Sequence, residues 1–300
     1  MTVRSLPSSE QLAALLAVVD EGTFEAAARR LSLTPSAVSQ RIRALESTAG
    51  QVVVVRTTPC APTEAGTVLL RMARQQQLLA DEAMAELNGQ AGGARTFAAG
   101  RADLPIAVNA DSLATWFVPA LTEFAGWDVD LRLHVEDQDH SSVLLRRAAV
   151  LGAVTSDPVA VGGCSVERLG VMRYVPAAAP ALVERHSRGR RIDWGALPVV
   201  RFNAKDDLQH RLLADHHVTN PPAHLVPSSQ GFLAAVRAGL GWGMLPLDQL
   251  DDDFDSGALV RLGARAHVDV TLHWQCWRLD SDLVRRTSRA VRSAARALHR

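Results

Sequence analysis

Three short amphipathic segments in close succession near the N-terminus constrain the fold of this chain most. Apolar residues recur at helical spacing over residues 12–19, 24–31 and 38–49, so each run predicts a helix with one buried side. A serine or threonine suited to cap a helix precedes each run, and only a few residues separate the runs. Helices joined so tightly must pack on one another. We therefore expect a small all-α domain whose second and third helices form a helix-turn-helix.

The third segment, "SLTPSAVSQRIRALE", has two different sides. Val38, Ile42 and Leu45 form a narrow apolar stripe, Thr34 can cap the helix, and Pro35 suits its first position. The opposite side carries hydroxyl, amide and guanidinium groups, on Ser36, Gln40 and Arg43. Such groups contact base edges in the major groove, with arginine favouring guanine and glutamine favouring adenine. A solvent-exposed surface helix would show the same pattern, so the neighbouring segments must decide between the two.

Two further features suit contacts with the DNA backbone. Ser39 and Arg41 lie at the edges of the apolar stripe, where phosphate contacts are favoured over base contacts. The segment "VVVVRTTPCAPT" is a β-branched run followed by a turn with two prolines, and it predicts a hairpin wing that carries Arg56.

A long helix is predicted next, over residues 63–87, about 37 Å in length. Its apolar and small residues step by three and four, as in a coiled-coil seam: Leu70, Ala73, Gln77, Ala80, Met84 and Leu87. We expect this helix to pack on a copy of itself and to make the chain at least a dimer. The alternative is a helix that lies across the second domain.

Beyond a Gly-rich hinge, "NGQAGGAR", predicted strands and helices alternate. The segments between residues 104 and 158 predict a βαβαβ unit with a parallel sheet, including one helix over "DSLATWFVPALTEF". A second α/β series follows, and a basic terminal helix ends the chain. We expect a DNA-binding domain at 1–62, a linker helix and hinge at 63–90, and an effector domain at 91–300. Lobe I takes in about 102–165 and 270–300, and lobe II about 166–269.

Composition limits the class of protein. The 300 residues are 47% hydrophobic and 21% charged, which indicates a globular chain, and the net charge of zero restricts any DNA contact to a local patch. The first residues lack the apolar core of a signal peptide, so we do not expect export, and no apolar run reaches membrane-spanning length. Cys60, Cys164 and Cys276 are far apart and suit a reducing cytoplasm. No motif indicates a catalytic site, a metal site or a bound cofactor.

The segment "FEAAARRLSLTPSAVSQRIRALE" with "RTTPCAPTEAG" resembles the signature of the LysR-type transcriptional regulators. The resemblance implies a winged helix-turn-helix, a dimerising linker helix and a two-lobed effector domain like a type II periplasmic binding protein. It also implies a palindromic DNA site and a homodimer or homotetramer. Three further segments resemble the regulators of lysine and arginine export: "GQVVVVRTTPCAPTEAG", "LPIAVNADSLATWFVPAL" and "VGGCSVERLG". Lysine or arginine is therefore the expected effector.

The expected effector site lies between the lobes, where strands end and helices begin. Free N–H groups there favour an α-carboxylate, with Ser112, Thr115, Ser228 and Ser229 as candidates. These hydroxyls could instead only cap their own helices. A basic effector also needs a carboxylate for its cationic groups, and this choice stays open among Asp111, Asp137, Asp206 and Asp207. Thr155 and Tyr174 are further candidates at the lobe crossing.

The sequence therefore predicts a ligand-responsive transcriptional regulator of a basic amino-acid exporter gene, without a catalytic step. Two alternatives remain at this point. One is an architectural or replication-origin DNA-binding protein that ignores amino acids. The other is an enzyme built on the α/β lobes, against which the missing nucleophile–base and metal spacings speak.

Overall fold

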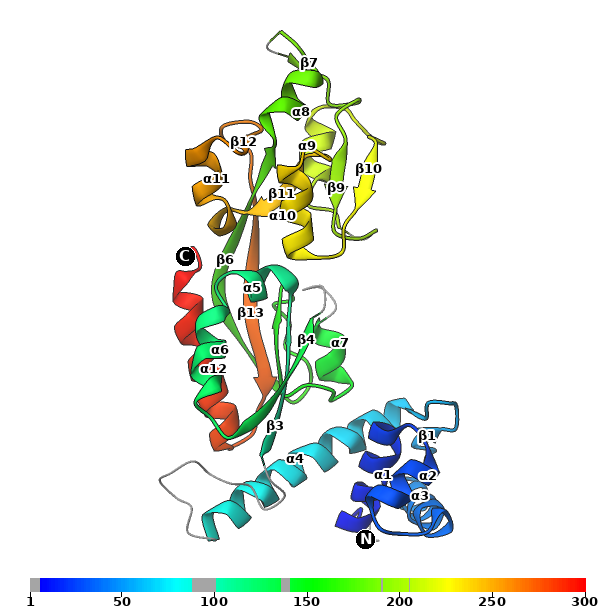
Figure 1. Ribbon diagram of the computed structural model, residues 1–300. Coiled ribbons are helices and arrows are strands. Elements are labelled where there is room, and N and C mark those ends of the chain that lie inside the picture. The colour runs from blue at the N-terminus through cyan, green and yellow to red at the C-terminus, as the bar shows by residue number, and fades with distance from the viewer. Residues whose placement is uncertain (1–5, 88–100, 136–140, 190, 205) are drawn as a thin grey trace.

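The computed structural model describes residues 6–87, 101–135, 141–189, 191–204 and 206–300. Figure 1 shows a small helical domain at the N-terminus, a long helix, and an elongated α/β domain with two lobes. The helical domain contains α1 (Ser9–Glu21), α2 (Phe24–Arg30) and α3 (Pro35–Ala49). All three expected caps are present, because the hydroxyls of Ser8, Thr23 and Thr34 each accept a backbone N–H three residues later.

The wing and the long helix follow as expected. Strands β1 (Val54–Val55) and β2 (Ala61–Pro62) pair antiparallel, and α4 (Glu64–Leu87) begins at the cap Thr63, whose Oγ1 accepts the N–H of Gly66 at 3.0 Å. Gly66 packs so closely against the wing that a Cβ there would overlap the carbonyl oxygen of Val53. The start of α4 is therefore part of the DNA-binding domain.

The predicted seam on α4 is wrong at its first half. Leu70 and Ala73 are buried in the core of the chain's own helical domain. Three of the apolar side chains that remain exposed on this helix, Val68, Met72 and Leu79, form a different stripe, while the exposed Met84 and Leu87 belong to the predicted seam. Helical spacing alone could not separate the two stripes, because the packing of α1 on α4 decides which one is covered.

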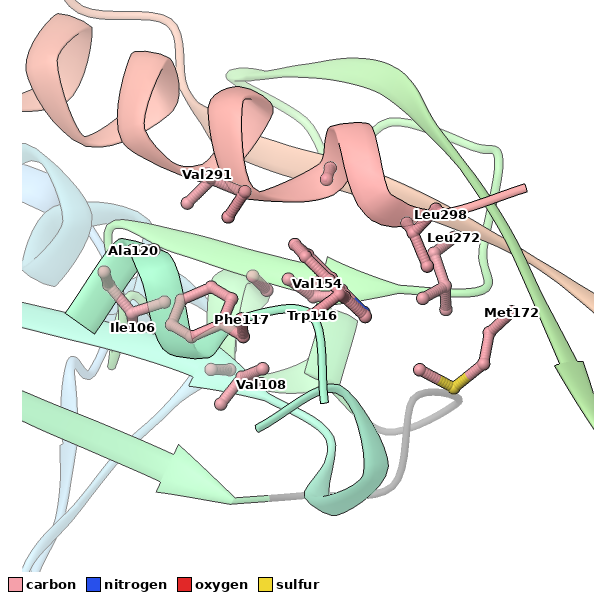
Figure 2. Close-up of a cluster of buried hydrophobic side chains, with 14 of the residues drawn as sticks. Ile106, Val108, Trp116, Phe117, Ala120, Val154, Met172, Leu272, Val291 and Leu298 are labelled. Carbon is pink, nitrogen blue, oxygen red and sulfur yellow. The ribbon is translucent and has the colours of Figure 1, made fainter. Parts of the chain in front are cut away.

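Lobe I is built on parallel strands, as the βαβαβ pattern predicts. Strand β3 (Ala102–Val108) lies between β4 (Val129–Val135) and β5 (Gly152–Thr155) and pairs in parallel with both. Helices α6 (Val118–Ala125) and α12 (Asp282–Ala294) pack together. Figure 2 shows Phe117 and Val291 among the apolar side chains between these helices and the strands. The helix α7 (Ser141–Arg146) packs on β5.

The single helix predicted over "DSLATWFVPALTEF" is two helices, α5 (Ala110–Ala114) and α6. The chain leaves helical geometry at Thr115, where φ is −123° and ψ is −106°. Pro119 lies in the first turn of α6, and a proline is tolerated there because its missing N–H has no acceptor. Because of this break, Thr115 lies at the C-terminal end of the short helix α5. In the single long helix that the sequence predicts, it would lie in the first turns.

Two long strands connect the lobes. Strand β6 (Cys164–Ala178) pairs antiparallel with β13 (Val268–Trp277), and Figure 1 shows both running from lobe I into lobe II. The main sheet has the order β11-β6-β13-β5-β3-β4, with β11 (Gly243–Pro246) on the lobe II side and β12 (Val260–Arg261) also paired to β6. The expected start of lobe II at about residue 166 falls inside β6, which starts at Cys164 and belongs to both lobes.

The rest of lobe II is a smaller α/β unit. Its parallel strands β9 (Val199–Arg201) and β10 (Ala223–Leu225) lie beside α10 (Ser229–Arg237), and β7 (Ser187–Arg188) pairs with β8 (Arg191–Ile192). The other helices are α8 (Pro180–Arg185), α9 (His210–Asp215) and α11 (Asp251–Ser256), with short 3-10 turns at Leu247–Gln249 and Ala295–Ala297. No helix among the described residues has the length and apolar character needed to cross a membrane.

We predict that Gly66→Ala destabilises the DNA-binding domain by about 1–3 kcal/mol, because the added methyl group must displace the backbone of the wing. Thermal unfolding of the two proteins measures the effect. Gly162→Ala is the matched control, since a Cβ at that glycine would have no atom within 4 Å. Equal stability of Gly66→Ala and wild type would contradict the close approach of α4 to the wing.

Candidate functional site

The recognition helix α3 has the two sides that its sequence predicts. Val38, Ile42 and Leu45 are buried against α1 and α2. Side chains on the opposite side are exposed, including Ser36, Gln40 and Arg43. Thr34 is also exposed, and its Oγ1 lies 2.9 Å from Oγ of Ser36, so the cap and the first polar residue of the helix contact each other.

The arginines of this domain fall into two groups. Arg41 forms an ion pair with Glu10 of α1 at 2.9 Å, which holds it at the edge of the helix beside the partly buried Ser39. Arg43 is exposed and has no ion pair within the described part of the chain. The guanidinium of Arg56 lies over the ring of Phe24, 4.8 Å from its centroid, and so the wing is positioned against the start of α2.

A cluster of polar side chains joins the two lobes. Asp111 of α5 accepts a hydrogen bond from the Tyr174 hydroxyl on β6 and another from the Ser229 hydroxyl at the start of α10, both at 2.9 Å. Nε2 of Gln249 donates to Oγ of Ser229 at 3.3 Å. We call Asp111, Tyr174, Ser229 and Gln249 the interlobe cluster. It brings together three of the candidate effector residues.

Gln249 is the member of this cluster that the sequence did not predict. It lies in the short 3-10 turn after β11, and no local pattern marks it as a site residue. Its place depends on how β11 pairs with β6, which is a long-range contact. Its Oε1 is buried and has no hydrogen-bond partner among the described atoms.

Two other candidates from lobe I, Ser112 and Thr155, point into the protein. Both are fully buried. The Oγ of Ser112 has no hydrogen-bond partner among the described atoms, and Oγ1 of Thr155 accepts the N–H of Asp157 at 3.1 Å. Thr115, at the end of α5, donates from its hydroxyl to the carbonyl of Asp111 at 2.6 Å.

The remaining candidates do not join the cluster. Ser228 is exposed and caps α10, where it accepts the N–H of Gly231. Asp207 is exposed and pairs with Arg201 and His210 in lobe II, so its position argues against a place in the cleft. Asp206 accepts hydrogen bonds from Phe202, Leu208 and Gln209 and so holds its own loop. Asp137 lies outside the described residues.

A pocket of about 700 Å³ lies between the lobes beside the interlobe cluster. Lobe I contributes Thr115 and Trp116 among others, and lobe II contributes Ser229 and Gln249. The pocket is lined by hydroxyl, amide and aromatic groups and by the carboxylate of Asp248. This volume and mixed lining suit a small polar ligand such as an amino acid.

The cysteines do not form a reactive site. All three are buried, and none of the described residues form a cluster that could hold a metal ion. Burial raises the pKa of the Cys164 thiol to about 11, so this group stays a neutral thiol at physiological pH.

Comparison with known proteins decides the family. Residues 9–67 match the family described as bacterial regulatory helix-turn-helix protein, lysR family, and residues 99–300 match the LysR substrate binding domain. The chain belongs to the LysR family. Its predicted winged helix-turn-helix, linker helix and two-lobed effector domain are thereby confirmed as the LysR fold.

Named LysR relatives are similar over almost the whole chain. The transcriptional regulator LysG of Mycobacterium tuberculosis is 49% identical over 294 residues, which cover 97% of this chain and 94% of the relative. The lysine export regulator LysG of Corynebacterium glutamicum is 44% identical over 95% of this chain and 97% of the relative. A structure of full-length C. glutamicum LysG with bound arginine aligns with a TM-score of 0.84 at 43% identity, covering 98% of this chain and 100% of that one.

These matches confirm the prediction of a LysR transcriptional regulator. The relatives are regulators of transcription and not enzymes, so the alternative of an enzyme built on the α/β lobes is excluded. Because the second helix of a helix-turn-helix enters the major groove, we propose the exposed side of α3 as the DNA-contacting surface.

We predict different effects for the two arginines of α3. Arg43→Ala weakens binding to the specific site by about 1–3 kcal/mol and relaxes base preference at one position of each half-site, because Arg43 is exposed on the polar side. Arg41→Ala, the matched comparison, weakens specific and random DNA alike and lowers the salt dependence. Binding to a library of randomised sites measures both effects. Unchanged base preference in Arg43→Ala would show that this residue does not face the bases.

Proposed function

We propose that this LysR regulator senses a basic amino acid, L-arginine or L-lysine, and controls the gene of an exporter for it. The observation that carries the proposal is the likeness to C. glutamicum LysG with bound arginine, which extends over both lobes. A lysine export regulator at 44% identity supports the nature of the controlled gene. The protein acts in the cytoplasm on DNA and uses the amino acid as effector, without a cofactor.

The interlobe cluster supports a cationic ligand. Asp111 presents a carboxylate where α5, β6 and α10 meet, and a guanidinium or ammonium can donate several charge-assisted hydrogen bonds to it. We assign Asp111 to a cationic group of the effector. The hydroxyls of Thr115, Ser228 and Ser229 are the proposed partners of the α-carboxylate. Ser112 and Thr155 are fully buried, so neither is accessible to an effector in this conformation.

The proposed oligomeric state rests on α4. Val68, Met72 and Leu79 form an exposed apolar stripe, and the exposed Met84 and Leu87 add apolar surface near the end of the helix, so a second α4 is the proposed partner. A two-fold dimer places two recognition helices on a palindromic promoter site, and two dimers form the proposed tetramer.

An architectural role without effector response is the weaker alternative. An architectural protein has no use for a polar interlobe pocket beside a carboxylate. Dependence of operator binding on arginine separates the two functions.

We predict that Leu79→Glu produces monomers with weak operator binding, because the charge falls in the exposed stripe of α4. Sedimentation velocity and gel-shift titration measure the two properties. Leu79→Met keeps an apolar side chain of similar volume and is the control that retains the dimer. A dimeric Leu79→Glu protein would place the dimer contact elsewhere.

We predict that the full chain binds L-arginine or L-lysine and rejects L-citrulline, the uncharged analogue of arginine, by roughly tenfold or more, since hydrogen bonds to charged groups contribute about 1.5–3 kcal/mol. Calorimetry with these ligands and L-glutamate measures the preference. Asp111→Asn removes the charge but keeps the size, and it should lose the preference for the cation. Ser228→Ala, which changes a nearby hydroxyl without a charge, should keep it. Equal binding of citrulline and arginine to wild type would refute the basic-effector proposal.

A further inference from the structure

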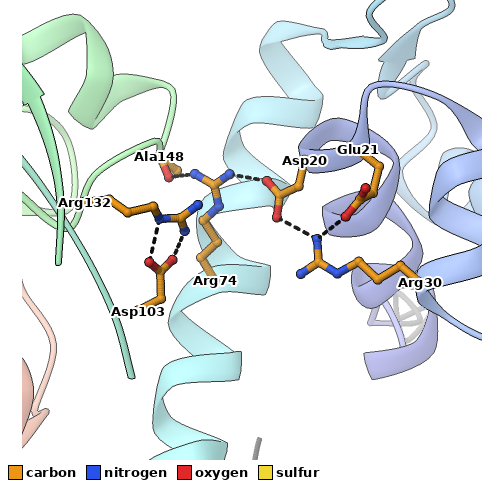
Figure 3. Close-up of polar contacts among 7 residues, drawn as sticks. All are labelled: Asp20, Glu21, Arg30, Arg74, Asp103, Arg132 and Ala148. Carbon is orange, nitrogen blue, oxygen red and sulfur yellow. Dashed lines mark hydrogen bonds and ion pairs between the residues drawn. The ribbon is translucent and has the colours of Figure 1, made fainter. Parts of the chain in front are cut away.

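One arginine of the linker helix contacts both the DNA-binding domain and lobe I. Nη2 of Arg74 donates to Oδ1 of Asp20 at 2.6 Å, and Nη1 donates to the backbone carbonyl of Ala148 (Figure 3). Asp20 belongs to the last turn of α1, and Ala148 follows α7 in lobe I. A single planar guanidinium therefore connects two domains that are joined along the chain only through α4 and residues 88–100.

The contact with Asp20 extends into the helix-turn-helix. The second oxygen of Asp20 accepts from Arg30 at 3.3 Å, and Arg30 also contacts Glu21 at 3.4 Å. Arg30 is the last residue of α2, which leads directly into the turn before α3. The side chains of Arg74 and Asp20 are only 22% and 29% exposed, so solvent screens this pair less than a fully exposed one.

A second contact, eight residues later, holds the other half of α4 on lobe I. The carboxylate of Glu82 accepts from the Ser281 hydroxyl and the Leu283 N–H, both at 2.9 Å, and from the Asp282 N–H at 3.3 Å. These N–H groups begin α12 and have no acceptor within that helix. A carboxylate at the positive end of the helix dipole is favourable, so Glu82 caps α12 from a different domain.

Two further contacts lie along the same side of the linker helix. Arg71 donates to the carbonyl of Gly162, and Leu78 packs against the core of lobe I. Arg71, Arg74, Leu78 and Glu82 step by three and four residues, so they share one side of α4. That side is distinct from the exposed apolar stripe, and lobe I can hold α4 while the stripe faces a second copy.

We infer that Arg74 and Glu82 are positioning residues that join the DNA-binding domain, the linker helix and lobe I of one chain into a unit. This inference rests on the proposed function in its last step, which is that effector-driven movement of lobe I reaches the DNA through these two contacts. Ala148 follows α7, and α7 packs on β5, which ends at the candidate Thr155.

Hydrogen exchange at the start of α12 tests the contact between α4 and lobe I without any effector. In Glu82→Ala, the amides of Asp282 and Leu283 lose their acceptor, and their exchange should accelerate at least tenfold. Glu86→Ala removes an exposed carboxylate one turn later on the same helix and should leave exchange at α12 unchanged. Wild-type exchange rates at α12 in Glu82→Ala would overturn the proposed contact.

Operator titrations with and without L-arginine test the coupling. Wild type should show an effector-dependent change within the usual range of roughly 5–150-fold. Arg74→Ala and the milder Glu82→Gln should bind L-arginine with an affinity within about twofold of wild type. In both variants, L-arginine should change operator affinity by a factor close to one. Arg74→Lys keeps the positive charge and should retain part of the effector-dependent change in operator affinity. Full coupling in both Arg74→Ala and Glu82→Gln would overturn the inference.

Asp20→Asn distinguishes a specific contact from general loosening. Asp20→Asn removes the negative charge that Arg74 contacts on the DNA-binding domain, and it leaves the hydrogen bond from Arg74 to Ala148 intact. It should therefore also reduce the effector response. The double variant with Arg74→Ala should be no worse than Arg74→Ala alone, because both changes break one contact. Additive losses would contradict a shared contact. If arginine does not change operator binding by the wild-type protein, the proposed function is refuted. The hydrogen-exchange experiment still tests whether α4 contacts lobe I.

Discussion

The antiparallel pairing of β6 with β13 is the interaction on which the effector domain depends. These two strands run side by side from Tyr174 paired with Val268 to Cys164 paired with Trp277. They are part of the sheet in both lobes, so each lobe is completed by strands that it shares with the other. Any change in the angle between the lobes must therefore bend or twist this pair. The pairing has a register irregularity between Leu272 and His273, which interrupts the regular ladder near its middle.

The same pair of strands places the interlobe cluster. Tyr174 lies on β6 on the lobe II side of the irregularity, and its hydroxyl meets Asp111 of lobe I. Ser229 reaches Asp111 from α10, which packs on β6 and β11. Because this lobe I carboxylate accepts hydrogen bonds from two donors on the lobe II side, its contacts depend on the angle between the lobes. A ligand that replaces one of these donors has different affinities for different angles, and that difference is what a ligand needs to shift a conformational equilibrium.

Local signals in the sequence predicted the elements well. Caps such as Ser8, Thr23 and Thr34 depend only on the next three residues, and the parallel strands of lobe I follow from runs of apolar residues. The sequence could not predict contacts between distant segments. Asp111 and Ser229 are 118 residues apart, and which of the open aspartates would face lobe II depends on the packing of α10. The seam on α4 was wrong for the same reason, since tertiary packing covered Leu70 and Ala73.

The distribution of arginines explains why the linker helix is an effective place for regulation. With zero net charge, the chain attracts DNA weakly as a whole, and Arg30 and Arg74 are already paired with acidic residues. Among the described residues of the DNA-binding domain, Arg29, Arg43 and Arg56 remain without an ion pair, so one half-site offers few phosphate or base contacts. Tight binding then requires both recognition helices of a dimer at once. Their spacing must match one helical turn of DNA, about 34–36 Å. In the proposed dimer, a small rotation of α4 on lobe I would change that spacing and so alter operator affinity without any change in the recognition helix itself.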